Sequence, residues 1–167
     1  ITFESEKGVG TTFVIRVPFK IDLDADKREE QKDVSEKSIK GLHILLAEDN
    51  ELNMEIAEFM LQNEGADVTK AWDGQEAVEL FRNSEPGEFD VILMDIMMPV
   101  MNGYETTKMI RSLDREDAKA IPIIAMTANA FTEDRIRAKE AGMDEHVAKP
   151  VDVELLIKVI HKLVKYN

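Results

Sequence analysis

From Gly41 to the end of the chain, short apolar runs typical of β-strands alternate five times with stretches of helical periodicity. The apolar runs are Leu42–Ala47, Asp67–Ala71, Val91–Met94, Ile121–Met126 and Glu145–Ala148. Strands that alternate with helices pair in parallel, and nearly continuous apolar strands are buried by helices on both faces of a sheet. The pattern therefore predicts an α/β fold with a doubly wound, five-stranded parallel sheet.

The expected helices follow from apolar spacing and from residues that begin or end helices. In the first helix Asn50 is a candidate N-cap and Gly65 ends the helix. Four apolar residues carry its helical spacing: Leu52, Ile56, Phe59 and Met60. Further helices are expected over 75–81, from 103 to about 113, over 132–141 and from 153 onward.

The first forty residues have a different pattern. Two alternating stretches, ITFES and TFVIRVP, are joined by a glycine-bearing turn, which predicts a β-hairpin within residues 1–20. Residues 21–40 mix charges of both signs and lack aromatic residues, as solvated linkers do. We therefore divide the chain into a hairpin segment (1–20), an acidic linker (21–40) and an α/β domain (41–167).

The charge balance excludes some partners and favours others. The chain carries 21 Lys and Arg against 34 Asp and Glu, a net charge of −13, of which −12 lies in residues 41–167. This balance argues against a nucleic-acid binder and favours a cation or a basic partner surface. The absence of cysteine excludes disulfides, thiolate metal sites and a cysteine nucleophile. The chain begins with Ile1 and has no apolar run long enough to span a bilayer, so we expect a cytoplasmic piece of a longer protein that makes no membrane contact itself.

Chemically active residues stand where the predicted strands end. The first strand is followed by Glu48 and Asp49, and the third by Asp95. Ligands of open parallel sheets bind at this carboxyl edge, near the switch point. If the first and third strands are neighbours, three carboxylates converge there, and Mg²⁺ is the natural counter-ion for such a set.

A carboxylate can itself be phosphorylated, as in aspartyl-phosphate intermediates. The phosphoryl oxygens would then need a metal ion, a Lys ammonium and a hydroxyl donor around them. Asp49, Lys149 and Thr127, each at the end of its own strand, supply that set. Taken singly, each residue has an ordinary explanation, such as a helix N-cap or a surface lysine. Their joint placement favours a functional site.

Four segments, LLAEDNELN, VILMDIMMPVMNGYE, IIAMTANA and GMDEHVAKPVD, resemble the response-regulator receiver domain in order and spacing over residues 41–165. The resemblance implies a flavodoxin-like strand order of 2-1-3-4-5, with Asp95 as the phosphoacceptor. It implies Mg²⁺ (or Mn²⁺) held by Glu48, Asp49, Asp95 and the main-chain carbonyl of Met97. It also implies Thr127 as the switch hydroxyl, Lys149 as the phosphate-pairing lysine, and a cis peptide between Lys149 and Pro150.

Positions that vary within this family suggest how the chain differs from other members. Met97 and Asn129 match positions that tune dephosphorylation, and we expect an intermediate rate because one is apolar and the other neutral. His146 stands at the family's aromatic switch position; its alternative role is that of a half-buried strand histidine. His43 is expected to be structural, and His161 has no flanking motif that supports phosphorylation.

The segment SEKGVGTTFVIRVPF resembles the last motif and closing strand of a histidine-kinase ATP-binding domain. Followed by a linker and a receiver, it implies a hybrid sensor histidine kinase whose receiver relays phosphoryl groups to a histidine phosphotransfer protein. The implied partners are the histidine phosphotransfer protein and the kinase core of the parent chain. A sensor region would anchor the parent chain to a membrane. The fragment itself should catalyse only its own phosphotransfer and slow autodephosphorylation. Residues 1–20 should be poorly ordered or pair their edges with another copy.

Three other functions fit the sequence less well. A haloacid-dehalogenase-like phosphatase has a second Asp two residues after its nucleophile, where this chain has Met97. A flavodoxin-like flavin binder needs a phosphate-binding first loop, and the acidic run from Glu48 to Glu51 would repel phosphate. A pseudo-receiver that serves only for docking does not need the complete acidic and lysine set.

Overall fold

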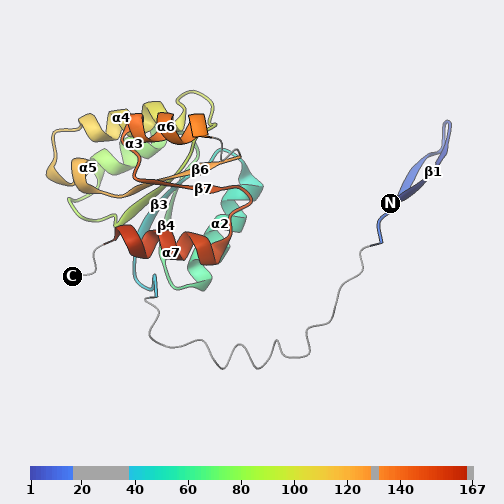
Figure 1. The fold of residues 1–167 in the computed structure, drawn as a ribbon, viewed down its shortest axis with the longest axis horizontal. Coiled ribbons are helices and arrows are strands. Elements are labelled where there is room, and N and C mark those ends of the chain that lie inside the picture. Colours follow the sequence, from blue (N-terminus) through green and yellow to red (C-terminus); the bar gives the residue numbers. More distant parts are fainter. Residues whose placement is uncertain (17–37, 129–131, 165–167) are drawn as a thin grey trace. The chain divides into compact units, whose positions relative to one another are not determined.

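The computed structural model describes residues 1–16, 38–128 and 132–164. The chain divides into two compact units, Ile1–Glu36 and Lys37–Asn167, and each is described by itself (Figure 1). Most of the predicted linker and residue Asn129 lie outside the described residues.

The described part of the first unit is the predicted β-hairpin. Strands β1 (Thr2–Glu6) and β2 (Gly10–Val14) pair antiparallel, and Phe3 lies opposite Phe13 with ring centroids 6.0 Å apart. Every residue of both strands is exposed. The expectation that residues 1–20 are poorly ordered or pair their edges with another copy stays a prediction.

The second unit contains a five-stranded parallel sheet. Its strands are β3 (His43–Ala47), β4 (Asp67–Ala71), β5 (Val91–Asp95), β6 (Ile123–Thr127) and β7 (Glu145–Ala148). They are hydrogen-bonded in the order β4-β3-β5-β6-β7, which is the predicted 2-1-3-4-5 order. The chain reverses direction across the sheet after β4, so the switch point lies between β3 and β5, where a ligand is expected.

Helices cover both faces of this sheet, as predicted (Figure 1). One buried cluster joins the sheet to α2 (Glu51–Asn63) and α7 (Val153–Leu163). The other joins it to α3 (Gly74–Asn83), α4 (Gly103–Ser112), α5 (Glu116–Ala120) and α6 (Thr132–Ala141). Within the described part of the chain, no helix is long and apolar enough to cross a membrane.

Helix α2 does not bury the residues that predicted it. Met54, Ala57 and Leu61 face the sheet. Leu52 (64%), Ile56 (45%) and Phe59 (66%) are exposed, and we call these three residues the α2 apolar stripe. The helix carries apolar residues on two opposite sides, and periodicity alone does not say which side packs.

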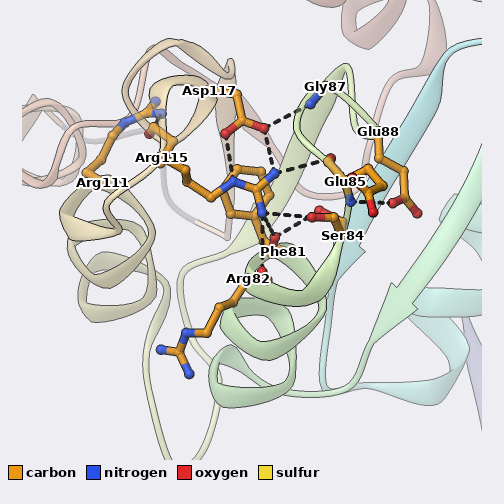
Figure 2. Close-up of polar contacts among 10 residues, drawn as sticks. Phe81, Arg82, Ser84, Glu85, Gly87, Glu88, Arg111, Arg115 and Asp117 are labelled. Atoms are coloured by element: carbon orange, nitrogen blue, oxygen red, sulfur yellow. Dashed lines mark hydrogen bonds and ion pairs between the residues drawn. The ribbon is translucent and has the colours of Figure 1, made fainter.

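The short helix α5 was not predicted, and one arginine attaches it to the rest of the domain (Figure 2). Arg115, at the N-cap of α5, donates to both carboxylate oxygens of Asp117 at 2.7 and 2.6 Å. Its guanidinium lies 4.4 Å from the ring centroid of Phe81 and donates to the carbonyl oxygen of that residue. It also donates to the carbonyl oxygens of Ser84 (3.1 Å) and Glu85 (3.2 Å) beyond the end of α3. We call this set of contacts the Arg115 clamp.

Candidate functional site

The predicted carboxylates meet at the carboxyl edge of the sheet. Strands β3 and β5 are neighbours with Ala47 opposite Met94, so the residues that follow them lie side by side. Glu48, Asp49 and Asp95 each offer a carboxylate oxygen, and these oxygens lie within 4.8 Å of one another. Glu48 is 2% exposed and Asp95 4%, whereas Asp49 is open to solvent. The structure therefore forms the predicted acidic cluster with two of its members buried.

Lys149 enters this cluster from the end of β7. Its Nζ lies 2.5 Å from Oε2 of Glu48 and 2.8 Å from Oδ2 of Asp95. The backbone N–H of Lys149 donates to the carbonyl oxygen of Thr127, and the peptide bond from Lys149 to Pro150 is cis, as predicted. Burial lowers the pKa of the Lys149 ammonium, but the hydrogen bonds to Asp95 and Glu48 outweigh burial and leave the pKa raised. The ammonium is thus held charged between two buried carboxylates.

Thr127 is the last residue of β6 and is 6% exposed. Its neighbour Met126 lies opposite Asp95, and Thr127 itself lies opposite Ala148 on β7. The register therefore places Thr127 at the same edge as Asp95 and Lys149, which is the position expected for a hydroxyl donor.

The loop after β5 is packed tightly against Asp95. The backbone N–H of Met97 donates to Oδ1 of Asp95 at 3.2 Å, and the Met97 side chain is 76% exposed. Gly103, the first residue of α4, donates to the carbonyl oxygen of Ile96. A Cβ on Gly103 would lie 2.3 Å from the carbonyl oxygen of Asp95, so only glycine fits there. The glycine of the PVMNGYE segment thus allows α4 to begin directly against the Asp95 backbone.

Asn53 is a site residue that the sequence reasoning missed. Its side-chain Nδ2 donates to Oε1 of Glu48 at 2.9 Å from the first turn of α2. Asparagine is a poor helix former, and Asn53 lies inside the helix, after the N-cap residue, where a better helix former would be expected. That mismatch was the available signal.

The remaining predicted residues lie outside the acidic cluster. His146 is half-buried in β7, and its Nδ1 lies 4.0 Å from Oε2 of Glu145. His43 begins β3 at the opposite edge of the sheet, 3.4 Å from Asp67. Asn129 is outside the described residues.

The donor set fits a hard divalent cation. Three carboxylates and one ammonium leave a formal charge of −2 at the cluster. Mg²⁺ binds through one or two carboxylates, keeps several waters and tolerates an open side toward solvent, which Asp49 provides here. Neither a thiolate nor an imidazole is among the grouped side chains, so a softer metal is disfavoured.

Comparison with known proteins agrees with this geometry. Histidine kinase 1 of Arabidopsis thaliana is 37% identical over 163 residues, covering 78% of this chain and 13% of that protein. The aerobic respiration control sensor protein ArcB of Escherichia coli K12 is 34% identical over 163 residues, covering 97% of this chain and 20% of that protein. The chain therefore spans about a fifth or less of these relatives.

Solved structures share the fold of the second unit. The receiver domain of a sensor histidine kinase from Pseudomonas aeruginosa PAO1, with a magnesium ion coordinated in its active site cleft, is 39% identical with a TM-score of 0.66. That match covers 74% of this chain and 97% of the other. The receiver domain of Ssk1, in complex with the histidine phosphotransfer protein Ypd1 of Saccharomyces cerevisiae, is 27% identical with a TM-score of 0.67 and coverages of 77% and 92%.

The family model of the response regulator receiver domain matches residues 44–161, which run from β3 to α7 and include every member of the acidic cluster. By this match, by its strand order and by its strand-end carboxylates and lysine, the chain belongs to the response regulator receiver domain family.

Proposed function

We propose that this receiver accepts a phosphoryl group from a phosphohistidine onto Asp95 and relays it to a histidine phosphotransfer protein, as part of a hybrid sensor histidine kinase. The observation that carries the proposal is the contact of Lys149 Nζ with Oδ2 of Asp95 inside a cluster of three carboxylates. An ion pair between Lys149 and Asp95 that served only the fold would not need Glu48 and Asp49 beside it. A phosphoryl site that uses a divalent cation does need such additional acids.

In the proposed reaction a carboxylate oxygen of Asp95 attacks the phosphorus atom of the phosphohistidine. The P–N bond breaks, the imidazole leaves with the electron pair and takes a proton from solvent, and an acyl phosphate remains on Asp95. Lys149 turns from the carboxylate to a phosphoryl oxygen, and the hydroxyl of Thr127 donates to another. Glu48, Asp49, Asp95 and the main-chain carbonyl of Met97 would hold Mg²⁺, which would neutralise negative charge on the phosphoryl oxygens.

The acyl phosphate should be lost at an intermediate rate. The exposed Met97 side chain gives attacking water neither an acid nor a base beside Asp95, and Asn129 is the second residue to which we assign this tuning. The measurement is phosphate release from the phosphorylated receiver, and a half-life of seconds would contradict the assignment.

We assign the conformational readout to Thr127 and His146. Thr127 lies opposite Ala148 on β7, two residues beyond His146, so a movement of its hydroxyl toward a phosphoryl group acts on the strand that carries His146. This strand packs beside α6, and the face that the two elements form together would report phosphorylation.

The α2 apolar stripe is the surface that we assign to the phosphotransfer partner. Helix α2 begins two residues after Asp49, so the stripe (Leu52, Ile56 and Phe59) borders the acidic cluster and spans about 10 Å along the helix. An exposed apolar surface beside an active site favours a protein partner. The partner of the similar receiver Ssk1, a histidine phosphotransfer protein, supports this choice of occupant.

A matched pair of variants tests this docking surface. Phe59→Glu should slow phosphoryl exchange with a phosphorylated histidine phosphotransfer protein by about tenfold or more, since a charge is forced into an apolar contact. Phosphorylation by acetyl phosphate, which needs no docking, should be unchanged. The control Ile136→Glu on α6, also an exposed apolar residue, should affect neither rate. Equal effects of the two variants would contradict the assignment.

We further propose that residues 1–20 are the end of a histidine-kinase ATP-binding domain, 21–40 the linker and 41–167 the receiver. The similarity to ArcB, which covers 97% of this chain, supports a kinase origin for the hairpin. Phe3 and Phe13 leave an apolar side of the hairpin exposed, which the kinase core of the parent chain would cover. In this proposal the parent is a cytoplasmic kinase anchored to a membrane by a sensor region.

To test the function, the whole chain is incubated with Mg²⁺ and acetyl phosphate, and the mass of the intact protein is then measured. The proposal expects one acid-stable, base-labile phosphoryl group that is lost on removal of Mg²⁺. Asp95→Asn should abolish the adduct, while Asp114→Asn, a change of an exposed aspartate of the same domain, should not. An adduct that survives Asp95→Asn would overturn the proposal.

A further inference from the structure

The two carboxylate oxygens of Glu48 have donors of different kinds. Oε2 accepts from the Lys149 ammonium at 2.5 Å, and that ammonium is shared with Asp95 at 2.8 Å. Oε1 accepts from the amide Nδ2 of Asn53 at 2.9 Å. Glu48 is buried, so these donors decide how its carboxylate is oriented.

Asn53 reaches Glu48 because of how α2 begins. Its own backbone N–H donates to the side chain of the N-cap residue Asn50 at 3.1 Å, which fixes the first turn of the helix. Asn50 thus uses its side chain for the helix, whereas Asn53 directs its side chain back to the end of β3. Asn50 therefore caps the helix, whereas Asn53, one turn later, contacts Glu48.

A divalent cation affects the two donors differently. It would compete with the Lys149 ammonium for the carboxylate of Glu48, because both are cations that bind carboxylate oxygens. The neutral amide of Asn53 does not compete in this way, and metal-binding carboxylates are ordinarily held by hydrogen bonds of this kind.

We propose that Asn53 is a positioning residue for the metal site: its amide holds Oε1 of Glu48 and so orients the carboxylate that would bind Mg²⁺. The inference rests on the proposed function, and it concerns the affinity for Mg²⁺ rather than phosphorylation. It assigns to the first turn of α2 a part in metal binding through a residue that is not itself a ligand.

Calorimetric titration of the whole chain with Mg²⁺ tests the proposal. Asn53→Leu keeps the side-chain size and removes the donor, and it should weaken Mg²⁺ binding by about tenfold. Asn53→Gln retains an amide donor and should bind Mg²⁺ more tightly than the leucine variant. Without Mg²⁺ the thermal midpoint should fall modestly in Asn53→Leu, since the buried Oε1 of Glu48 loses its donor, and should stay closer to that of the parent in Asn53→Gln.

The control is Gln62→Leu on the same helix. Its amide donates to Glu58 at 3.4 Å, which is a similar contact far from the metal site, so its affinity for Mg²⁺ should equal that of the parent. Equal affinities of the parent and Asn53→Leu would overturn the inference and leave the proposed function standing, as would equal losses in the leucine and glutamine variants. Failure of the parent chain to bind Mg²⁺ would overturn both.

Discussion

Lys149 is the residue on which the charge balance of the site depends. Its ammonium lies between two carboxylates that are almost fully buried, Glu48 and Asp95. Without it, both acids would remain in a poorly solvated site, because Lys149 is their ion-pair partner among the described residues. Removing one partner of a buried ion pair is costly for this reason, even where the intact pair adds little net stability.

Lys149→Met should therefore lower the free energy of unfolding by about 3 kcal/mol in the absence of metal. Mg²⁺ should restore part of this loss, because a divalent cation supplies the missing positive charge. Urea unfolding with and without Mg²⁺ measures both effects. The control Lys162→Met, which removes a 68% exposed lysine paired with Glu145, should cost about 0.5 kcal/mol and show no extra rescue. A Lys149→Met variant that gains no more from Mg²⁺ than the parent would contradict this explanation.

The principal acids and the lysine were predictable because the carboxyl ends of parallel strands meet at one edge once the strand order is known. Asn53 was not predicted, and its low helix propensity was a weak signal, since a polar residue in the first turn of a helix is equally compatible with capping or solvent. Only the contact of its amide with Glu48 distinguishes these roles.

Among the elements, α5 shows what tertiary contacts add to sequence pattern. Its five residues are too short to display a helical period, so apolar spacing gave no signal for it. The Arg115 clamp attaches α5 to the end of α3 by donating to the carbonyl oxygen of Phe81 in the last turn of α3 and to those of Ser84 and Glu85 beyond it (Figure 2). Hydrogen bonding to Asp117 raises the pKa of Arg115 and lowers that of Asp117, so the pair stays charged.

Arg115→Lys should destabilise the domain by about 2 kcal/mol, although the charge is kept. A lysine ammonium is a single point with three donors and does not reproduce the planar set of contacts to Asp117 and several carbonyls. The measurement is the urea midpoint and slope. Arg82→Lys is the matched control, because its side chain points away from the clamp in Figure 2 and is exposed. The explanation fails if both substitutions have the same small effect.

Helix α2 shows a further limit of prediction at the scale of elements. Its existence and its N-cap Asn50 were correct, yet the spacing that identified it belongs to the exposed α2 apolar stripe. The buried side of α2 includes Met54 and the small Ala57. Alanine is less hydrophobic than Leu or Phe, so it contributes less to an apolar pattern in the sequence. The stripe that identified the helix is the surface that we assign to the partner.

For the whole molecule, the pH dependence of stability follows from the shifted groups. Asp117 and Glu145 have pKa values lowered chiefly by hydrogen bonds from Arg115 and Lys162. Such groups stabilise the fold above their unfolded pKa values, and the stabilisation is lost as pH falls through the folded values. Lys149 has a raised pKa, so its contribution is complete below its unfolded value and is lost as pH rises through the folded one.

The free energy of unfolding should therefore fall below about pH 4 and again above about pH 10.5. Urea unfolding at a series of pH values measures this profile. Asp117→Asn should make the acid limb shallower and leave the alkaline limb unchanged, while Lys149→Met should flatten the alkaline limb. An acid limb of the same steepness in Asp117→Asn would show that this carboxylate does not contribute as stated.

The most direct test of the central claim locates the phosphoryl group chemically. Borohydride reduces an acyl phosphate on aspartate to homoserine, so treatment of the phosphorylated chain followed by peptide mass mapping identifies the modified residue. The account predicts homoserine at position 95, only in samples that received both a phosphoryl donor and Mg²⁺, with Asp49 unchanged. Homoserine at another aspartate, or none at position 95, would contradict it.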